Sequence, residues 1–203
     1  MLKVIAFDYG GVLGTEANDW SKTFKNVLEA ANLSLEEMDE IWERHWQFVS
    51  TGKEEIKEYW KDASEKNHID PEKLRQLYNS DITLNEKVFE FAKSLKKDHK
   101  LIIISNDTKD WMAAKIARFK LDEVFEKIYC SATVGIRKPN NEIFELVLKE
   151  ENIKPEELLL IDNQENNISA AKNLGILTLL FSNQTHTIAD IKKGYENIIR
   201  NIK

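Results

Sequence analysis

The stretch "KVIAFDYGGVLG" (residues 3–14) combines a short apolar run, one aspartate and three glycines. No polar side chain interrupts the run between Val4 and Phe7, which is typical of a strand that is covered on both faces of a sheet. The glycines after Asp8 allow the backbone to turn sharply. The stretch therefore predicts a buried strand that ends at Asp8 and is followed at once by a turn.

Four more apolar runs of similar length follow along the chain, with helical patterns between them. The predicted strands are residues 2–8, 100–105, 127–130, 157–162 and 176–181. The predicted helices are residues 85–98, 108–119, 140–151 and 167–175, with Asn85 as an N-cap and Gly175 near a C-terminus. Strands that alternate with single helices favour right-handed crossovers and a parallel sheet. We therefore predict an α/β fold with a doubly wound parallel sheet.

The long interval from residue 15 to residue 81 contains helical patterns and no convincing strand. Ser34 and Glu37 have the spacing of a capping box, and the "DPE" at residues 70–72 favours the start of a helix. We predict that residues 15–81 form an inserted α-helical cap domain. Residues 1–14 and 82–203 then form the α/β core domain.

Four of the five tryptophans lie in this predicted cap, namely Trp20, Trp42, Trp46 and Trp60. Aromatic side chains dominate the packing of small cores. We interpret these tryptophans as the core of the helical domain, in preference to an aromatic wall that faces a substrate.

The composition excludes several classes of partner. The chain has 203 residues, with 29 basic and 35 acidic side chains and a net charge of −6, and it has no basic stripe for nucleic acid. Cys130 is the single cysteine, so no internal disulfide forms. No apolar run is long enough to cross a bilayer, and the run before Asp8 is too short for a signal peptide. We expect a cytoplasmic protein without a membrane or nucleic-acid partner.

Polar residues follow three of the predicted strands at the points where they end. These residues are Asp8, the "SND" at 105–107, and Asp162 with Asn163. In an open parallel sheet, ligands bind outside the carboxyl ends of the strands, where the strand order reverses. We therefore expect the three groups to meet in one crevice, together with Lys138 from "GIRKP" (residues 135–139).

Over essentially its whole length the sequence resembles the haloacid dehalogenase-like (HAD) hydrolase superfamily. Four motifs in the family's order carry the resemblance: "DYGGVL" (8–13), "IIISND" (102–107), "GIRKP" (135–139) and "LLIDNQENNISAAKNLGI" (159–176). The family has a Rossmann-like core with a cap domain inserted after the first motif, which matches the predicted helical interval. Residues 50–60 resemble the cap segment of sugar-phosphate phosphatases in one subgroup.

The resemblance implies a phosphatase mechanism and a role for each motif residue. Asp8 is the expected nucleophile, which forms an aspartyl phosphate that water hydrolyses. Ser105 and Lys138 are the other expected catalytic residues, and both contact the phosphoryl group. Gly11 and Asn106 are expected to take part in substrate binding through the backbone and side chain near the phosphate.

The resemblance also implies a magnesium ion. The expected ligands are Asp8, the backbone carbonyl of Gly10, Asp162 and Asn163. Asp8 and Asp162 are like charges in one crevice, and a hard cation with oxygen ligands removes their repulsion.

Two positions depart from the pattern of the family's phosphatases. Gly10 stands where the family usually has an aspartate that acts as general acid and base, a function worth about 10²–10⁴ in rate. Asp107, Glu16 and His45 are candidate substitutes. Asn163 stands where a second acid is usual, and its neutral amide predicts weaker binding of Mg²⁺.

We predict a Mg²⁺-dependent phosphatase that acts on a small phosphorylated metabolite. One alternative is a metal-free 2-haloacid dehalogenase, in which a cap arginine, Arg44 or Arg75, would hold the carboxylate of the substrate. A second alternative belongs to another class, namely a weakened enzyme that retains the fold as a binding module. This second alternative follows from the departures at Gly10 and Asn163.

Overall fold

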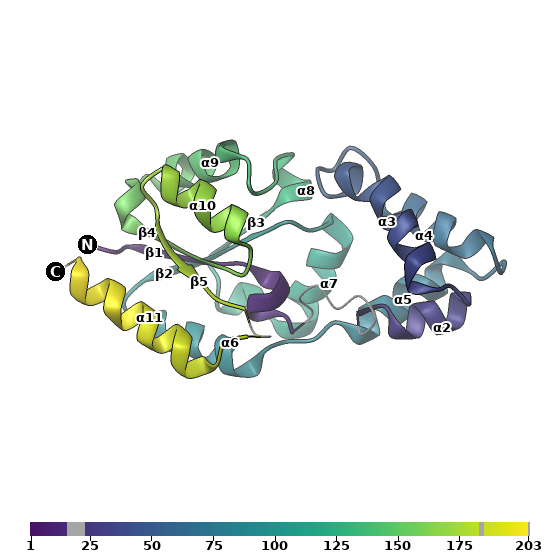
Figure 1. The fold of residues 1–203 in the computed structure, drawn as a ribbon, viewed down its shortest axis with the longest axis horizontal. Coiled ribbons are helices and arrows are strands. Elements are labelled where there is room, and N and C mark those ends of the chain that lie inside the picture. The colour runs from purple at the N-terminus through teal and green to yellow at the C-terminus, as the bar shows by residue number, and fades with distance from the viewer. Residues whose placement is uncertain (16–22, 183–184, 203) are drawn as a thin grey trace.

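The fold is a five-stranded sheet flanked by helices, with a separate layer of helices at one end (Figure 1). The computed structural model describes residues 1–15, 23–182 and 185–202. Every predicted strand is present, and all neighbouring strands are parallel. The strands are β1 (Val4–Phe7), β2 (Lys100–Ser105), β3 (Lys127–Cys130), β4 (Leu158–Asp162) and β5 (Leu177–Leu180).

The strand order is β3-β2-β1-β4-β5. The chain therefore proceeds outward from β1 to β2 and β3, and then continues on the other side of β1 with β4 and β5. This reversal is the switch point at which open α/β sheets bind ligands. The register pairs Phe7 with Ile103 on one side and with Ile161 on the other, so the ends of β1, β2 and β4 lie side by side.

Helices cover both faces of the sheet, as predicted for a doubly wound fold (Figure 1). Ile5 and Phe7 of β1 point to one face, and Val4 and Ala6 point to the other, which is the alternation of a strand buried on both sides. On the Phe7 face lie α6 (Glu86–Leu95), α7 (Lys109–Phe119) and α11 (Ile188–Asn201), and on the Ala6 face lie α9 (Asn141–Glu151) and α10 (Glu165–Asn173). Shorter turns are η1 (Tyr9–Leu13), η2 (Leu121–Glu123), α8 (Ser131–Val134) and η3 (Pro155–Glu157).

The helix ends agree with the predicted capping residues. The side chain of Asn85 accepts a hydrogen bond from the backbone N–H of Val88 at the start of α6. Gly175 lies just after α10 with a φ of +84°. One helix, α11, is not among the predicted elements, although Thr187 and Asp190 form a capping box at its start.

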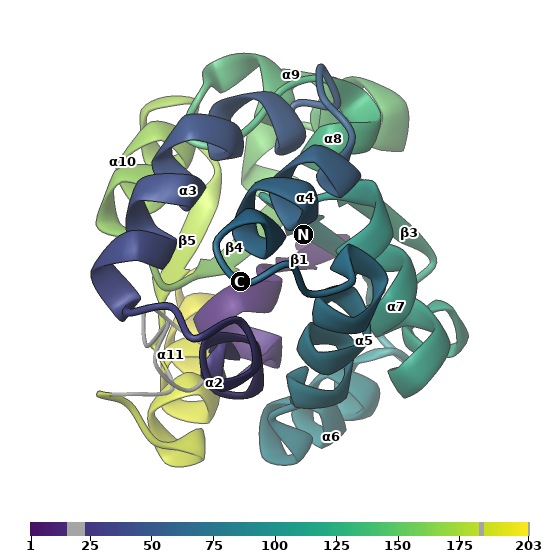
Figure 2. The same ribbon diagram turned by 90° about the vertical axis from the view of Figure 1, so that its right-hand side faces the viewer.

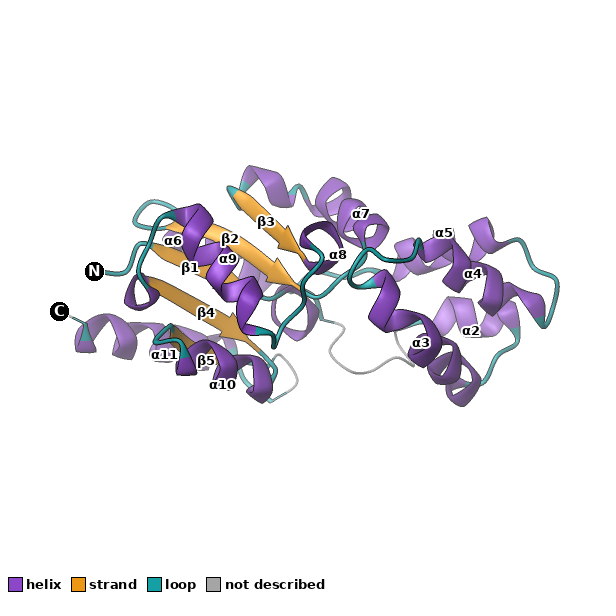
Figure 3. Cartoon of the chain, turned by 90° about the horizontal axis from the view of Figure 1, so that it is seen from above, coloured by secondary structure: helices purple, strands orange, loops and turns teal. Residues whose placement is uncertain are grey.

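Among the described residues, four helices form a layer over the carboxyl ends of the strands (Figure 2), and we call them the helical layer. They are α2 (Lys25–Ala31), α3 (Leu35–Val49), α4 (Ile56–Glu65) and α5 (Pro71–Asp81). Ser34 and Glu37 form the predicted capping box, and Asp70 caps α5. The strands point toward this layer (Figure 3).

The helical layer has an apolar cluster of its own, in which Trp60 is 1% exposed. Trp111 from α7 joins that cluster, so the layer packs directly on the α/β part. The division into a core domain and a cap domain at residues 15–81 remains a prediction, and Trp20 and Glu16 lie outside the described residues. Across the described ranges, no helix has the length and apolar character needed to cross a membrane.

Candidate active site

The polar residues at the strand ends meet in one cavity of about 340 Å³. Asp8, Ser105, Asn106, Lys138 and Asn163 all line it, as the sequence predicts. Asp162 is fully buried directly beneath them, with its carboxylate bonded to Lys138. The cavity therefore lies at the switch point of the sheet, between the strand ends and the helical layer.

The turn after β1 sets the direction of the Asp8 carboxylate. Asp8 Oδ1 accepts a hydrogen bond of 2.8 Å from the backbone N–H of Tyr9. Gly11 has a φ of +75°, which an L-residue adopts only with strain. Gly10 lines the cavity, whereas Gly11 is buried in the turn and is not in the cavity wall. Gly11 thus shapes the turn, and its predicted contact with substrate remains a prediction.

Lys138 links two strand ends through its ammonium group. Its Nζ donates to Asp162 Oδ2 at 2.5 Å and lies 2.9 Å from Asp8 Oδ1, and the residue is 2% exposed. Asn106 holds the backbone of this lysine, because its amide nitrogen donates to the Lys138 carbonyl oxygen and its amide oxygen accepts from the Lys138 N–H, both at 2.8 Å. Asn106 therefore positions Lys138.

The protonation of this cluster follows from its burial and its charges. Burial raises the pKa of Asp8 from 3.8 to about 6, with Asp162 adding to the rise and Lys138 opposing it. Burial alone would lower the pKa of Lys138, but the carboxylates of Asp162 and Asp8 outweigh it and raise that pKa. Lys138 is therefore an ammonium between two acidic groups.

Three of the described residues donate hydrogen bonds to the side-chain carboxylate of Asp162. Its Oδ1 accepts from the backbone N–H of Gln164 at 2.8 Å. The side chain of Asn167 donates to both carboxylate oxygens at 3.0 and 3.1 Å. With the ammonium of Lys138, these bonds engage both oxygens of Asp162. Asn167 thus supports the Asp162 carboxylate.

The side-chain amide of Asn163 reaches the turn after β1. One of its two terminal atoms lies 3.1 Å from the carbonyl oxygen of Gly10 and 3.2 Å from Asp8 Oδ2. With the nitrogen at this place, the amide donates to both oxygens. A half turn of the amide brings its oxygen there instead. Three oxygens, from Asp8, Gly10 and Asn163, then meet at one point.

The chemistry of these donors fits a hard cation such as Mg²⁺. The donors are carboxylate, backbone carbonyl and amide oxygens, and two carboxylates against one ammonium leave one negative charge. Within the described ranges no three His, Cys, Asp or Glu side chains gather into a metal-binding group, so sites that rest on several histidines or cysteines do not apply there.

The three candidates for a general acid are not equivalent in the structure. Asp107 is buried and bonded through Oδ2 to Lys115 Nζ at 2.7 Å. His45 is bonded to Glu54 and to Asp62 within the helical layer. Glu16 lies outside the described residues. Neither Asp107 nor His45 therefore presents a free proton donor to the cavity.

The rest of the cavity wall is aromatic. It contains Trp42, Trp46, Tyr78 and Trp111. Trp60 lies in the apolar cluster as expected, but Trp42 and Trp46 are only half-buried and also face the cavity. The interpretation of the cap tryptophans as core residues therefore holds for Trp60 and is incomplete for these two.

Several lining residues are not among the sequence-based candidates: Thr23, Tyr78, Trp111, Lys115, Gln164 and Asn166. For two of these residues, the position in the sequence already indicated a place near the site. Trp111 lies in the first turn of the helix after "SND", and such a turn starts at the carboxyl end of a strand. Gln164 directly follows the predicted ligands Asp162 and Asn163.

Comparison with known proteins agrees with this arrangement of strands and motifs. The chain matches a glyceraldehyde 3-phosphate phosphatase of Pyrococcus furiosus with 36% identity over 101 residues, which are 49% of this chain and 41% of that protein. It thus spans less than half of that relative's length. A D-ribitol-5-phosphate phosphatase of Bacteroides thetaiotaomicron is 26% identical over 194 residues, which cover 88% of this chain and 91% of that protein.

A solved structure and a family model extend the comparison. A HAD family enzyme of Bacteroides thetaiotaomicron, in complex with magnesium and inorganic phosphate, shares the fold with a TM-score of 0.75 and 21% identity over 89% of this chain and 94% of that chain. The family model described as haloacid dehalogenase-like hydrolase matches residues 5–181, which include all four motifs. By this match the chain belongs to the haloacid dehalogenase-like hydrolase family.

Proposed function

We propose that this hydrolase is a Mg²⁺-dependent phosphatase of a small phosphorylated metabolite, with Asp8 as its nucleophile. The observation that carries the proposal is the position of Lys138 Nζ. This atom lies 2.9 Å from Asp8 Oδ1 and 2.5 Å from Asp162 Oδ2, at the carboxyl ends of β1 and β4. Relatives named as phosphatases of glyceraldehyde 3-phosphate and ribitol 5-phosphate support a small phosphorylated substrate.

In this proposal, Asp8 attacks phosphorus and the bond to the leaving oxygen breaks. Lys138 neutralises charge on the nucleophile and on the phosphoryl group, and Ser105 offers its hydroxyl to a phosphoryl oxygen. Water then attacks the phosphorus of the aspartyl phosphate and releases the carboxylate of Asp8.

The residues proposed to hold the cation are Asp8, the carbonyl of Gly10 and Asn163. When bound, Mg²⁺ would neutralise negative charge on the phosphoryl oxygens. Asp162 adds its negative charge nearby, although hydrogen bonds already engage both its oxygens. Its main part in the proposal is to hold Lys138, and direct ligation by Asp162 remains a prediction.

The test is turnover of two phosphate compounds whose leaving groups depart without protonation, acetyl phosphate and phenyl phosphate. We expect release of phosphate with Mg²⁺, a loss of activity with a chelator that added Mg²⁺ restores, and a decrease of at least about 10³-fold in Asp8→Asn. The matched control is Asp110→Asn, which changes a carboxylate on the first turn of α7 that the cavity lining does not include. A wild-type rate equal to that of Asp8→Asn would refute the phosphatase.

A binding module is the second candidate, because Gly10 offers no side chain for proton transfer and Asp107 is engaged by Lys115. This candidate predicts that phosphate binds with Mg²⁺, and that neither acetyl phosphate nor phenyl phosphate is hydrolysed. Calorimetric binding of phosphate together with the turnover assay separates the two candidates.

The metal-free dehalogenase lacks support from the two candidate arginines. Arg44 pairs with Asp62, and Arg75 pairs with Glu72 and Asp110. The described part of the cavity lining contains no arginine that would bind a carboxylate. Asp162 would also repel such a substrate.

A further inference from the structure

The aromatic part of the cavity wall is a row of rings. Trp46 stacks on Trp42, with ring centres 4.2 Å apart and planes 17° apart. Trp42 is nearly parallel to Trp111 at 5.6 Å and 4°, and Trp111 stacks on Tyr78 at 4.3 Å and 27°. All four rings line the cavity that contains Asp8. The row therefore begins at Trp46 on α3, passes through Trp111 of α7 and ends at Tyr78 on α5.

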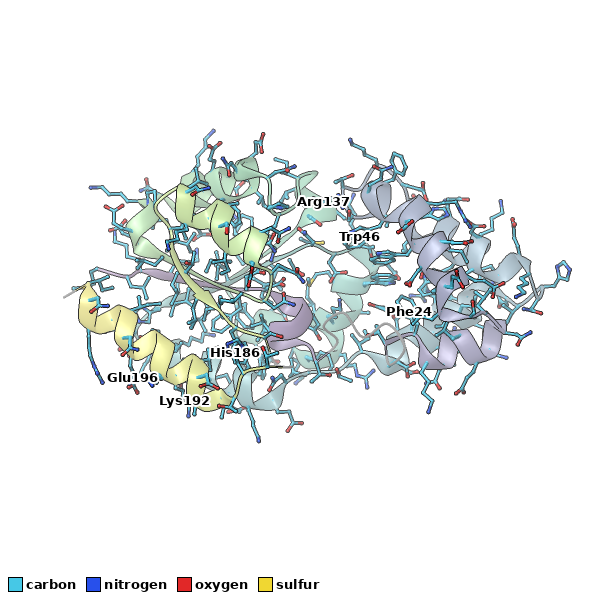
Figure 4. The ribbon with its side chains drawn as sticks, viewed as in Figure 1. Phe24, Trp46, Arg137, His186, Lys192 and Glu196 are labelled. Carbon is cyan, nitrogen blue, oxygen red and sulfur yellow. The ribbon has the colours of Figure 1, made fainter. Side chains whose placement is uncertain are left out.

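Trp46 is the outer end of this row. It is half-buried, and its only ring contact among the described side chains is the one with Trp42. Trp46 points from α3 toward the α/β part of the molecule (Figure 4). A second flat ring that enters the cavity would continue the row on the other side of Trp46, because offset parallel stacking is a favourable arrangement of aromatic rings.

The position of the aromatic residues argues against a role in packing alone. Trp60 on α4 is 1% exposed and fills the apolar cluster of the helical layer. Trp42 and Trp46 lie one helical turn apart on α3 and retain exposed surface at the cavity. Ligand cavities combine such apolar and aromatic walls with a few polar groups that fix orientation. The polar groups here are at the strand ends.

An independent observation concerns the proton that a leaving group normally requires. Gly10 has no side chain, and the described carboxyl groups of the lining are Asp8 itself and Asp107, which is paired with Lys115. A sugar or alkyl oxygen leaves slowly without protonation, since general acid catalysis contributes about 10²–10⁴ in rate. An oxygen attached to an aromatic ring leaves as a phenolate, whose charge spreads into the ring.

From these two observations we propose that the substrate is an aryl phosphate whose flat ring stacks on Trp46. This inference rests on the proposed phosphatase function. Asp8 forms the new bond to phosphorus, the bond from phosphorus to the aryl oxygen breaks, and its electron pair remains on the departing phenolate. Water then attacks phosphorus, the bond from phosphorus to Asp8 breaks and restores its carboxylate, and both protons of that water leave with the product as dihydrogen phosphate.

Binding of two unreactive phosphonates tests the stacking without relying on turnover. Phenylphosphonate and cyclohexylphosphonate carry the same charged group on a flat and on a saturated ring. With Mg²⁺ present, calorimetry should give about tenfold tighter binding of phenylphosphonate. In Trp46→Leu the two affinities should become equal. In Phe48→Leu, a control on the same helix at a side chain that is 40% exposed, the preference should persist.

Equal affinities in the wild-type protein overturn the inference, as does binding of neither phosphonate. A preference that survives in Trp46→Leu also overturns it, because the ring would then lie elsewhere.

Turnover gives a second and separate readout. Phenyl phosphate should exceed cyclohexyl phosphate in kcat by about 10²-fold or more, since only the phenolate leaves without an acid. If acetyl phosphate is hydrolysed but phenyl and cyclohexyl phosphate react equally, the inference fails and the phosphatase stands. If no phosphate is hydrolysed while the Trp46-dependent preference for phenylphosphonate persists, the proposed function fails and the aromatic site stands.

Discussion

The two walls of the cavity are built in different ways. At the strand ends, buried charged and amide groups hold one another, as in the pairs of Lys138 with Asp162 and of Asn106 with the Lys138 backbone. In the aromatic wall, which the helical layer and Trp111 of α7 form together, the rings contact one another face to face, with Trp46 at the outer end. The first wall is defined by charge and hydrogen bonds, and the second by shape.

This difference separates chemistry from selection. A buried polar network accepts few changes, because each lost partner leaves an unpaired buried group. A wall of stacked rings tolerates exchange of one apolar side chain for another at a modest cost. We therefore expect substitutions at the strand ends to affect rate and stability together, and substitutions in the aromatic wall to affect which ligand binds.

The largest expected effect is that of Lys138→Met. The change removes the ammonium between Asp8 and Asp162 and leaves two like charges in a buried place. Loss of one partner of a buried pair costs about 3–5 kcal/mol of the free energy of unfolding. Loss of a charge that stabilises the transition state should lower kcat by about 10²–10³-fold. Urea denaturation and phosphate release with Mg²⁺ measure the two effects.

Lys115→Met is the matched control for this prediction. Lys115 is also a buried lysine in an ion pair, 2.7 Å from Asp107, but it does not contact Asp8. The Lys115→Met variant should lose a similar amount of stability and retain at least about ten times the kcat of Lys138→Met. Equal losses of kcat in both variants would show that burial of charge, and not contact with Asp8, sets the effect.

Gly52→Ala tests the contact between the loop before α4 and the α/β part of the molecule. Gly52 lies in the loop before α4 with a φ of +68°, and a Cβ there would clash with the carbonyl oxygen of Ala132. The loop must therefore move away from the α/β part. We expect kcat/KM to fall about 10- to 100-fold, because small misplacements of groups that position a substrate are costly in catalysis.

Gly135→Ala separates the clash from the backbone strain. Gly135 has a φ of +79°, but its Cβ would meet nothing within 4 Å. The Gly135→Ala variant should lose about 1–2 kcal/mol of the free energy of unfolding and retain its kcat/KM. If both variants have the same kcat/KM, the contact between Gly52 and Ala132 does not matter for the reaction.

Asn163→Asp changes the charge at the predicted cation site. The new carboxylate would add a negative charge beside Asp8 Oδ2 and the Gly10 carbonyl oxygen. More ligand charge strengthens binding of hard cations, so we expect about tenfold tighter binding of Mg²⁺ in a calorimetric titration. Asn166→Asp adds the same charge at an exposed neighbour and should have a smaller effect. Unchanged or weaker binding in Asn163→Asp would remove Asn163 from the site.

How far the sequence predicts the molecule also differs between the two walls. Asp8, Ser105 and Asp162 were predictable as neighbours, because each directly ends a short apolar strand and the carboxyl ends of parallel strands lie together. Lys138 was expected in the same crevice because it lies between the last two of these residues along the chain and because of the family resemblance, although no periodicity places a loop lysine. The hydrogen bonds that the side chains of Asn106 and Asn167 donate to the cluster depend on side-chain directions, which spacing does not give.

The aromatic wall was not predictable in this way. The spacing of Trp42 and Trp46 identifies a common face of α3, but the angle at which the helical layer packs decides whether that face meets a core or a cavity. Trp111 comes from the other part of the molecule and completes the row. The last helix, α11, was missed, although Ile188, Ile191 and Ile198 follow a helical period and its Thr187 cap was visible in the sequence.

The smallest expected effect comes from Thr108→Ala, which loosens the helix that carries Trp111. The hydroxyl of Thr108 accepts a hydrogen bond of 3.1 Å from the backbone N–H of Trp111 at the start of α7. Its loss should cost about 1 kcal/mol, as should the loss of the Ser34 cap in Ser34→Ala. Only Thr108→Ala should also weaken the binding of phenylphosphonate, by about twofold, because Trp111 belongs to the row of rings. Calorimetry on both variants decides this, and equal affinities would mean that the rings keep their places without the cap.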